Sequence, residues 1–253
     1  MSTSKIALVT GGSRGLGKDM AQNLAKKGRD VILTYHTQQA EAEGVVAEIK
    51  AMGQQAVALQ LDASNVGSFG GFFDQVKTVL RDTFDADQFD FLINNAGTGL
   101  YAPYPETSEQ QFDEVLNIHF KGPFFLTQQA LPLMNDGGGI INISSGLTRI
   151  IYPGSSTYAS MKAAMETLTK YQAKELASRR IRANIVAPGA IETDFGGGRT
   201  RDNKEINAHI ASLTAMGRVG LPTDIGSVVA FLCTPEAGWI DAQRIEVSGG
   251  QGI

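Results

Sequence analysis

The first 27 residues constrain the fold more than any other part of the chain. Residues 5–10 (KIALVT) form a short apolar run rich in strand-forming residues, and the glycine-rich turn 11–17 (GGSRGLG) follows at once. A helical pattern then continues to about Lys27. This order of strand, glycine turn and helix is typical of the first unit of a parallel α/β sheet. We therefore expect strands and helices to alternate along the rest of the chain.

The glycine turn itself predicts a dinucleotide-binding site. Its spacing is G-x-x-x-G-x-G, which lets the backbone approach a diphosphate at a helix N-terminus, where free N–H groups and the helix dipole favour anions. A glycine-rich turn can also serve only to pack a helix against a strand. Under the binding hypothesis the contacts come from Gly11, Ser13, Arg14, Gly15, Leu16 and Gly17.

Strand and helix patterns do alternate through the remaining sequence. Strands are expected at residues 31–35, 56–61, 89–93, 139–143, 181–187 and 244–247, and helices at 38–52, 69–81, 108–134, from 155 and from 222. A chain of 253 residues with 42% hydrophobic residues can bury one substantial core, and no repeat or linker divides it. The sequence thus predicts one doubly wound α/β domain, residues 1–253, with a parallel sheet.

Composition excludes several classes of partner. A net charge of -4 gives no basic surface for nucleic acid or an anionic membrane, so a small-molecule partner is expected. Cys233, the single cysteine, lies in an apolar run and is expected to be a buried, inert thiol. His36, His119 and His209 are scattered without zinc-ligand spacing, so no metal is expected. No signal peptide or membrane span is apparent, and we expect a soluble cytoplasmic protein.

The end of the second predicted strand indicates the type of dinucleotide. Sites that prefer NAD usually carry an acid there to hold the ribose 2′-hydroxyl. Here Tyr35 and His36 occupy that place, and no acid appears until Glu41. A 2′-phosphate is therefore not repelled and can pair with Arg14, so NADP(H) is favoured over NAD(H). After the third strand, Asp62 followed by Ala63 offers either an acceptor for the adenine amino group or a helix cap.

The stretch 144–162 carries the predicted chemistry. If the segment from residue 155 is helical, Tyr158 and Lys162 project from one face, one turn apart. Moving a tyrosine pKa from near 10 to near 7 requires about 4 kcal/mol, and one positive charge at ~4 Å supplies about that much at an effective dielectric of ~20. Tyr158 is then able to exchange a proton with a substrate oxygen, and Ser145 to hydrogen-bond the same oxygen. A surface helix with a chance Tyr/Lys pair is the alternative.

Two further segments are expected to reach the same end of the sheet. Asn117 is a poor helix former inside the predicted helix 108–134, and Pro123 cannot donate to the carbonyl oxygen of His119, which bends the helix there. Residues 188–193 (PGAIET) leave the sixth strand at its ligand-binding end, and the glycine-rich segment 190–217 is expected to form a mobile lid.

Together these motifs resemble the short-chain dehydrogenase/reductase family over essentially the whole chain. The resemblance implies a Rossmann-like sheet of seven parallel strands in the order 3-2-1-4-5-6-7, and hydride transfer between a nicotinamide and a carbonyl or alcohol. The residues that carry it are Thr10, Gly11, Gly15, Gly17, Asn94, Asn95, Ala96, Gly97, Asn117, Ser145, Tyr158, Lys162, Pro188 and Gly189.

The same resemblance implies a role for each site residue. Tyr158 is the acid/base, Ser145 polarises the substrate oxygen, and Asn117 holds a water in a proton relay. Lys162 binds the ribose and lowers the pKa of Tyr158. The further cofactor contacts are expected from Asp62, Ala63, Asn94, Ala96, Gly97, Pro188, Gly189, Ile191 and Thr193.

The nearest branch resembles 3-oxoacyl-carrier-protein reductases and related carbonyl reductases. A carrier protein is acidic, and its docking surface typically includes a basic turn into the fifth strand. Here that turn carries Asp136 and no cation, although Arg179 and Arg180 are available elsewhere. A small ketone, aldehyde or sugar-like substrate is therefore favoured over a 3-oxoacyl thioester. A catalytically silent dinucleotide sensor on the same fold is the alternative from another class.

The C-terminal segment predicts assembly. The last strand, residues 244–247, lies at a sheet edge, and Trp239 shortly before it exposes a large apolar group unless something covers it. Packing of Trp239 into its own core is the alternative. Because family members commonly form tetramers, the resemblance implies a homotetramer with two-fold axes.

Overall fold

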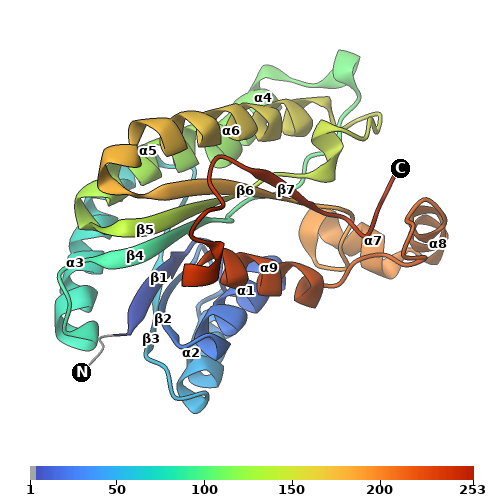
Figure 1. The fold of residues 1–253 in the computed structure, drawn as a ribbon. Helices are drawn as coiled ribbons and strands as arrows, with labels where there is room; N and C mark the ends of the chain where they lie inside the picture. Colours follow the sequence, from blue (N-terminus) through green and yellow to red (C-terminus); the bar gives the residue numbers. More distant parts are fainter. Residues whose placement is uncertain (1–3) are drawn as a thin grey trace.

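Seven parallel strands form one twisted sheet in the order β3-β2-β1-β4-β5-β6-β7 (Figure 1). The computed structural model describes residues 4–253. The order agrees with the one that the family resemblance implies. The strands are β1 (Lys5–Val9), β2 (Arg29–Tyr35), β3 (Ala56–Gln60), β4 (Phe89–Asn94), β5 (Met134–Ile143), β6 (Arg182–Pro188) and β7 (Arg244–Val247).

Helices cover both faces of the sheet, while α7 and α8 lie beyond one end of it, on the side of the C-terminus (Figure 1). One face carries α1, α2 and α9, and the other carries α3, α5 and α6. The helices are α1 (Gly15–Lys26), α2 (Gln39–Ala51), α3 (Phe69–Phe84), α4 (Glu109–Leu116), α5 (Gly122–Ala130), α6 (Ser156–Glu175), α7 (Arg199–Asp202), α8 (Lys204–Ser212) and α9 (Pro222–Leu232).

The alternation of side chains along each strand builds the two hydrophobic layers. In β1, Ile6 and Leu8 enter the core with α3 and α5, whereas Ala7 and Val9 enter the core with α1, α2 and α9. A central strand with helices on both faces has no solvent-facing side, and its sequence is therefore a continuous run of apolar residues. This burial explains why the first strand was recognisable from sequence.

The sequence predicted one helix over residues 108–134, and this prediction is wrong in two ways: the helix is interrupted, and it ends before Met134. The chain forms α4, a π-helical turn at Asn117–Lys121, and α5, and β5 already begins at Met134. The bend expected near Pro123 is present as this turn, in which the N–H of Gly122 donates to the carbonyl oxygen of Asn117. A Cβ on Gly122 would lie 2.0 Å from the carbonyl oxygen of Ala63, so only glycine permits this close approach. The π turn therefore depends on a contact between distant segments.

Candidate active site

The glycine turn is shaped to receive a diphosphate. Gly11 has φ +65°, and a Cβ on Gly17 would lie 2.0 Å from the carbonyl oxygen of Gly11. The N-terminus of α1 follows, and its first turn holds no acidic residue that would repel an anion. These features fit the nicotinamide dinucleotide that the sequence predicts.

Asn95 holds the glycine turn against the end of β4. Its side-chain amide donates to the carbonyl oxygens of Thr10 and Gly11 at 2.8 and 3.1 Å, and the Thr10 hydroxyl accepts from the backbone N–H groups of Asn95 and Ala96 at 3.0 Å. In the sequence, Asn95 is one of the residues that carry the family resemblance, and no site contact was predicted for it. Its structural role is to fix two cofactor-facing loops relative to each other.

Arg14 lies in the glycine turn, which is joined to β2 by a hydrogen bond from the Gly12 N–H to the Thr34 carbonyl oxygen, and it is the residue expected to bind the 2′-phosphate of NADP(H). It is exposed, and its guanidinium lies 3.9 Å from the Asp194 carboxylate. Tyr35 ends β2 and His36 follows it, and Asp62 follows β3. Burial acts to raise the pKa of Asp62, but hydrogen bonds from the Ser64 hydroxyl and backbone N–H outweigh it and lower that pKa. The Asp62 side chain therefore makes a local turn, and its adenine contact stays a prediction.

Ser145, Tyr158 and Lys162 meet at the carboxyl end of β5. Ser145 follows this strand within two residues and accepts from the N–H of Leu147, while Tyr158 and Lys162 are buried on one face of α6. The Lys162 ammonium donates to the carbonyl oxygen of Ile143 at 2.8 Å. In an open parallel sheet this end is where ligands bind, so the three side chains lie where a substrate is expected.

The expected lowering of the Tyr158 pKa toward 7 is wrong for the protein in this structure. Burial raises the pKa of Tyr158 to about 12, against a smaller lowering by a hydrogen bond with the Ser145 hydroxyl. Burial also lowers the pKa of Lys162 to about 8. The Lys162 Nζ lies 5.7 Å from the Tyr158 ring centroid and donates to the Ile143 carbonyl oxygen, and no lowering of the Tyr158 pKa by Lys162 accompanies this geometry.

The segment after β6 covers Tyr158. The ring of Phe195 lies 5.8 Å from that of Tyr158, centroid to centroid, and Thr193 packs against Gly15 of the glycine turn. Farther along, the Arg199 guanidinium stacks over the Tyr101 ring at 5.3 Å. Pro188 and Gly189 lead into this segment from the end of β6, and Ile191 pairs with Gly220. The position of residues 190–217 fits the lid that the sequence predicts.

His119 is a buried neighbour of Tyr158 that the sequence analysis did not include in the site. The two rings meet edge to face with centroids 4.9 Å apart, and His119 Nε2 lies 2.7 Å from the Thr98 carbonyl oxygen. Burial is the main reason that the pKa of His119 falls to about 3, and the Lys162 charge adds to this. Asn117, predicted from sequence, lies on the same π turn and is only half-buried. Its carbonyl oxygen closes the π turn.

Polar side chains buried in the sheet brace the strand ends that carry the site. The amide of Asn94 donates to Thr127 and to Asn142 at 2.9 and 2.8 Å, and the amide of Asn142 donates to Thr169 and Gln172. This network links β4 and β5 with α5 and α6. Within it, Asn94, an expected cofactor contact, is tied by its side chain to Thr127 of α5 and Asn142 of β5.

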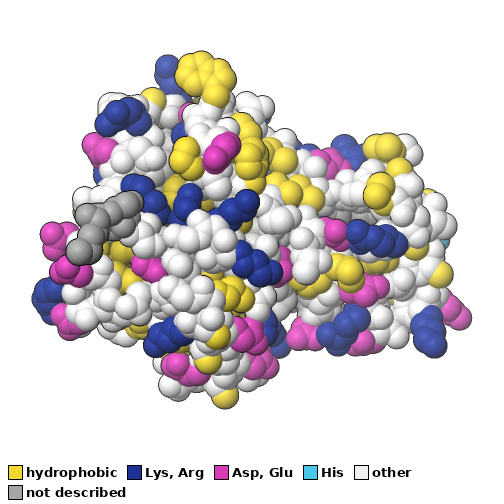
Figure 2. Space-filling model, turned by 60° about the horizontal axis from the view of Figure 1, so that its bottom comes forward, with side chains coloured by type: hydrophobic (Ala, Val, Ile, Leu, Met, Phe, Trp, Pro, Cys, Tyr) yellow, Lys and Arg dark blue, Asp and Glu magenta, His cyan; other side chains and the backbone are white. Residues whose placement is uncertain are grey.

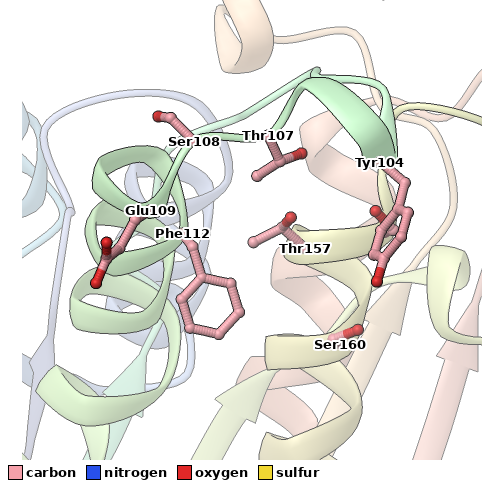
Figure 3. Close-up of a pocket in the computed structure, with 8 residues that line it drawn as sticks. Tyr104, Thr107, Ser108, Glu109, Phe112, Thr157 and Ser160 are labelled. Atoms are coloured by element: carbon pink, nitrogen blue, oxygen red, sulfur yellow. The ribbon is translucent and has the colours of Figure 1, made fainter.

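A separate cavity of about 400 Å³ lies between α4 and α6 (Figure 3). Thr157 and Ser160 line it from α6, and Phe112 lines it from α4. Tyr158 and Lys162 do not line this cavity. It is therefore distinct from the site formed by Ser145, Tyr158 and Lys162.

The sequence and fold are similar to those of known reductases. A family model described as enoyl-(acyl carrier protein) reductase matches residues 11–251. The hydroxynaphthalene reductase-like protein Arp2 of Metarhizium brunneum is 35% identical over 257 residues, or 97% of this chain and 94% of Arp2. The 3-oxoacyl-[acyl-carrier-protein] reductase FabG of Staphylococcus aureus is 37% identical over 253 residues, or 99% of each chain.

Similarity also extends to a solved structure with a bound cofactor. The crystal structure of the landomycin C-6 ketoreductase LanV with bound NADP and rabelomycin matches with a TM-score of 0.89 at 36% identity, covering 98% of this chain and 96% of LanV. Like the two sequence relatives, it spans nearly the whole chain, so the similarity includes both the sheet and the loops around the site.

Proposed function

The chain belongs to the short-chain dehydrogenase/reductase family, and on that premise we propose that it is an NADP(H)-dependent ketoreductase of a small-molecule ketone. Membership makes it an oxidoreductase that acts on carbonyl or hydroxyl groups with a nicotinamide dinucleotide. The observation that carries the proposal is the meeting of Ser145, Tyr158 and Lys162 at the carboxyl end of β5, beneath Phe195.

The protonation of Tyr158 fits the direction of carbonyl reduction. With its pKa raised to about 12, the phenol keeps its proton at neutral pH and can give it to a substrate oxygen. The Ser145 hydroxyl, which is hydrogen-bonded to Tyr158, is placed to hydrogen-bond the same oxygen. The glycine turn would hold the diphosphate of a nicotinamide dinucleotide, which when bound would supply the hydride. Tyr158 is therefore proposed as the general acid and Ser145 as the residue that polarises the carbonyl.

The aromatic rim of the site supports a ring-containing ketone. Tyr101 and Tyr152 are about half exposed, and Phe195 is 48% exposed while its ring packs on Tyr158. Tyr101 also lies against Gly154, which places the loop 150–154 beside it. The exposed face of Phe195, whose ring packs on Tyr158, favours stacking of a flat substrate. The name of the relative Arp2 refers to a hydroxynaphthalene, which has such a ring system.

A 3-oxoacyl thioester is the second candidate, because FabG is 37% identical over the whole chain. The contacts of Arg179 near β5 do not favour binding of an acyl carrier protein. The Arg179 guanidinium donates to the Asp136 carboxylate at 2.8 Å and to the carbonyl oxygens of Leu131 and Met134. This cation is thus already neutralised and is a poor contact for an acidic carrier protein.

The experiment is NADPH oxidation with a panel of carbonyl compounds. We expect turnover of bicyclic aryl ketones such as 1-tetralone to exceed that of acetoacetyl thioesters, and Tyr158→Phe to abolish it while NADPH affinity changes little. Tyr171→Phe, on the exposed side of α6, is the matched control. Turnover of thioesters alone would make the 3-oxoacyl thioester the favoured substrate in place of the small-molecule ketone. No turnover of any compound would support the sensor alternative, and a tenth of the activity left in Tyr158→Phe would show that Tyr158 is not the acid.

The same proposal places the enzyme in a reducing cytoplasm. Cys233 is the only cysteine, it is fully buried, and burial raises the pKa of its thiol to about 12. A thiol in this state neither forms a disulfide nor reacts readily. Within residues 4–253, no helix is long and apolar enough to cross a membrane.

A further inference from the structure

The segment that follows β7 lies between three parts of the site. Residues 248–253 contact the loop after β6, the turn after Ser145, and the end of the expected lid 190–217. They begin at the carboxyl end of β7, on the edge where an open parallel sheet binds its ligands. The segment is therefore in a position to set how these three parts lie relative to one another.

The side chain of Gln251 holds the first residue of the lid. Its amide oxygen accepts from the backbone N–H of Ala190 at 2.8 Å, and a Cβ on Gly189 would lie 2.8 Å from the same oxygen. Within residues 4–253, the structure records no other partner for the Ala190 N–H. Ala190 directly precedes the part of the lid that contains Ile191 and Thr193, the expected carboxamide contacts. A shift of Ala190 would therefore displace those contacts.

The backbone around Gln251 holds the other end of the same lid. Gln251 forms an antiparallel bridge with Thr214, which lies just after α8. The N–H of the next residue, Gly252, donates to the Leu213 carbonyl oxygen at 2.9 Å. One residue thus contacts both ends of the segment 190–217, the start with its side chain and the end with its backbone.

Arg149 joins this arrangement to the turn that follows Ser145. Its guanidinium donates to the carbonyl oxygens of Gln251 and Gly252 at 2.7 and 3.0 Å. The residues on either side of Gln251, Gly250 and Gly252, have φ of +75° and +68°, a left-handed conformation that favours glycine. The path that brings Gln251 to the lid is therefore encoded in the sequence, and it is fixed on the same turn that carries the serine.

We propose that Gln251 is a positioning residue for carbonyl reduction, which sets the spacing of the two lid ends and thereby the place of residues 190–193. The inference rests on the proposed function. A misplacement of about 1 Å between reacting groups can cost on the order of 100-fold in rate. The phosphates of NADPH would be held at the glycine turn rather than by residues 190–193. Loss of the Gln251 contact should therefore lower kcat much more than the affinity for NADPH.

The experiment compares Gln251→Leu, which removes the acceptor, with Gln251→Glu, which keeps one. Gln55→Leu, at an exposed position just before β3, is the matched control. We expect Gln251→Leu to lower kcat for ketone reduction at least tenfold, while the Kd for NADPH by titration calorimetry stays within about threefold. Gln251→Glu should keep kcat within about threefold of the wild type. Gln251→Asn, whose amide is one methylene shorter, should behave like Gln251→Leu.

A second measurement does not depend on turnover. Trypsin cleaves after Arg199, Arg201 and Lys204, which are exposed within the lid. In cofactor-free protein we expect cleavage there to be at least fivefold faster in Gln251→Leu than in the wild type, because the lid ends are less restrained. Equal cleavage, or a loss of kcat in Gln251→Glu as large as in Gln251→Leu, would overturn the proposal. If no carbonyl compound is turned over, faster cleavage still supports the restraint by Gln251, while the proposed reaction fails.

Discussion

At the scale of single residues, Arg14 has two competing partners. Its guanidinium lies 3.9 Å from the Asp194 carboxylate on the segment that follows β6, and both side chains are about half exposed. An exposed ion pair of this kind contributes about 0 to 1 kcal/mol. A phosphate bonded to Arg14 contributes more, about 1.5 to 3 kcal/mol, because the hydrogen bond is to a fully charged group. A 2′-phosphate should therefore displace Asp194.

Removing Arg14 tests the proposed cofactor preference. Arg14→Ala should weaken NADPH binding roughly 10- to 150-fold, the equivalent of that hydrogen bond, and leave NADH binding nearly unchanged. Isothermal titration of both cofactors measures this. As a companion, Asp194→Asn frees Arg14 and should tighten NADPH binding by no more than about fivefold. Equal affinities for NADPH and NADH in the wild type would rule out the preference.

At the scale of elements, an ion network joins the end of β5 to β7 and the C-terminus. The Glu166 carboxylate of α6 accepts from the Ser144 and Thr148 hydroxyls and from Arg244. Arg244 also donates to Glu246, which accepts from Arg149. Ser144 and Thr148 lie on either side of Ser145, so this network fixes the backbone around the residue that we propose polarises the carbonyl.

The network predicts how stability depends on pH. The hydrogen bond from Arg149 is the main cause that lowers the pKa of Glu246 from 4.5 to about 2. A carboxyl group with a depressed folded-state pKa stabilises the fold above its unfolded pKa, and this contribution fades as pH falls from 4.5 toward 2. Glu246→Gln should therefore destabilise the protein at pH 7, by about 1.5 kcal/mol after allowance for exposure, and less at pH 3.

Urea unfolding of wild type and Glu246→Gln at both pH values measures this difference. The exposed Glu41→Gln serves as the matched control, since the structure gives its side chain no hydrogen bond within residues 4–253. A penalty in Glu246→Gln that is as large at pH 3 as at pH 7 would show that packing, rather than charge, sets it.

The sheet was predictable from sequence because its signals are local. Buried parallel strands are apolar runs, and the glycine turn lies between two such patterns, so strand order followed once the family was apparent. The bend near Pro123 was predictable, but its form as a π turn was not, because that turn places Gly122 against the Ala63 carbonyl oxygen of a distant loop. His119 was overlooked for a related reason: its residue type is uninformative until the turn brings it to Tyr158. The ion pair between Arg14 and Asp194 was likewise not predictable, because the two residues are far apart in the sequence and meet only in the folded chain.

At the scale of the whole molecule, apolar side chains stand exposed among charged ones (Figure 2). Trp239 is 100% exposed, so the alternative that it packs into its own core is wrong. Ile253 at the C-terminus is 93% exposed, whereas Ala237 is fully buried. Nearby, β7 is a four-residue strand that forms one edge of the sheet. An open edge next to an exposed indole favours association through a two-fold axis, in which each copy covers the other.

We propose that the protein is a homotetramer in which one of two interfaces is built around β7 and Trp239. Light scattering at micromolar concentration should report about four times the chain mass of 27.0 kDa. Trp239→Ser removes the largest exposed apolar group at that interface and should shift the population toward dimers, whereas Met52→Ser, at the end of α2, should leave it unchanged. A wild-type monomer would refute the assembly. A tetramer unaffected by Trp239→Ser would place the interface elsewhere.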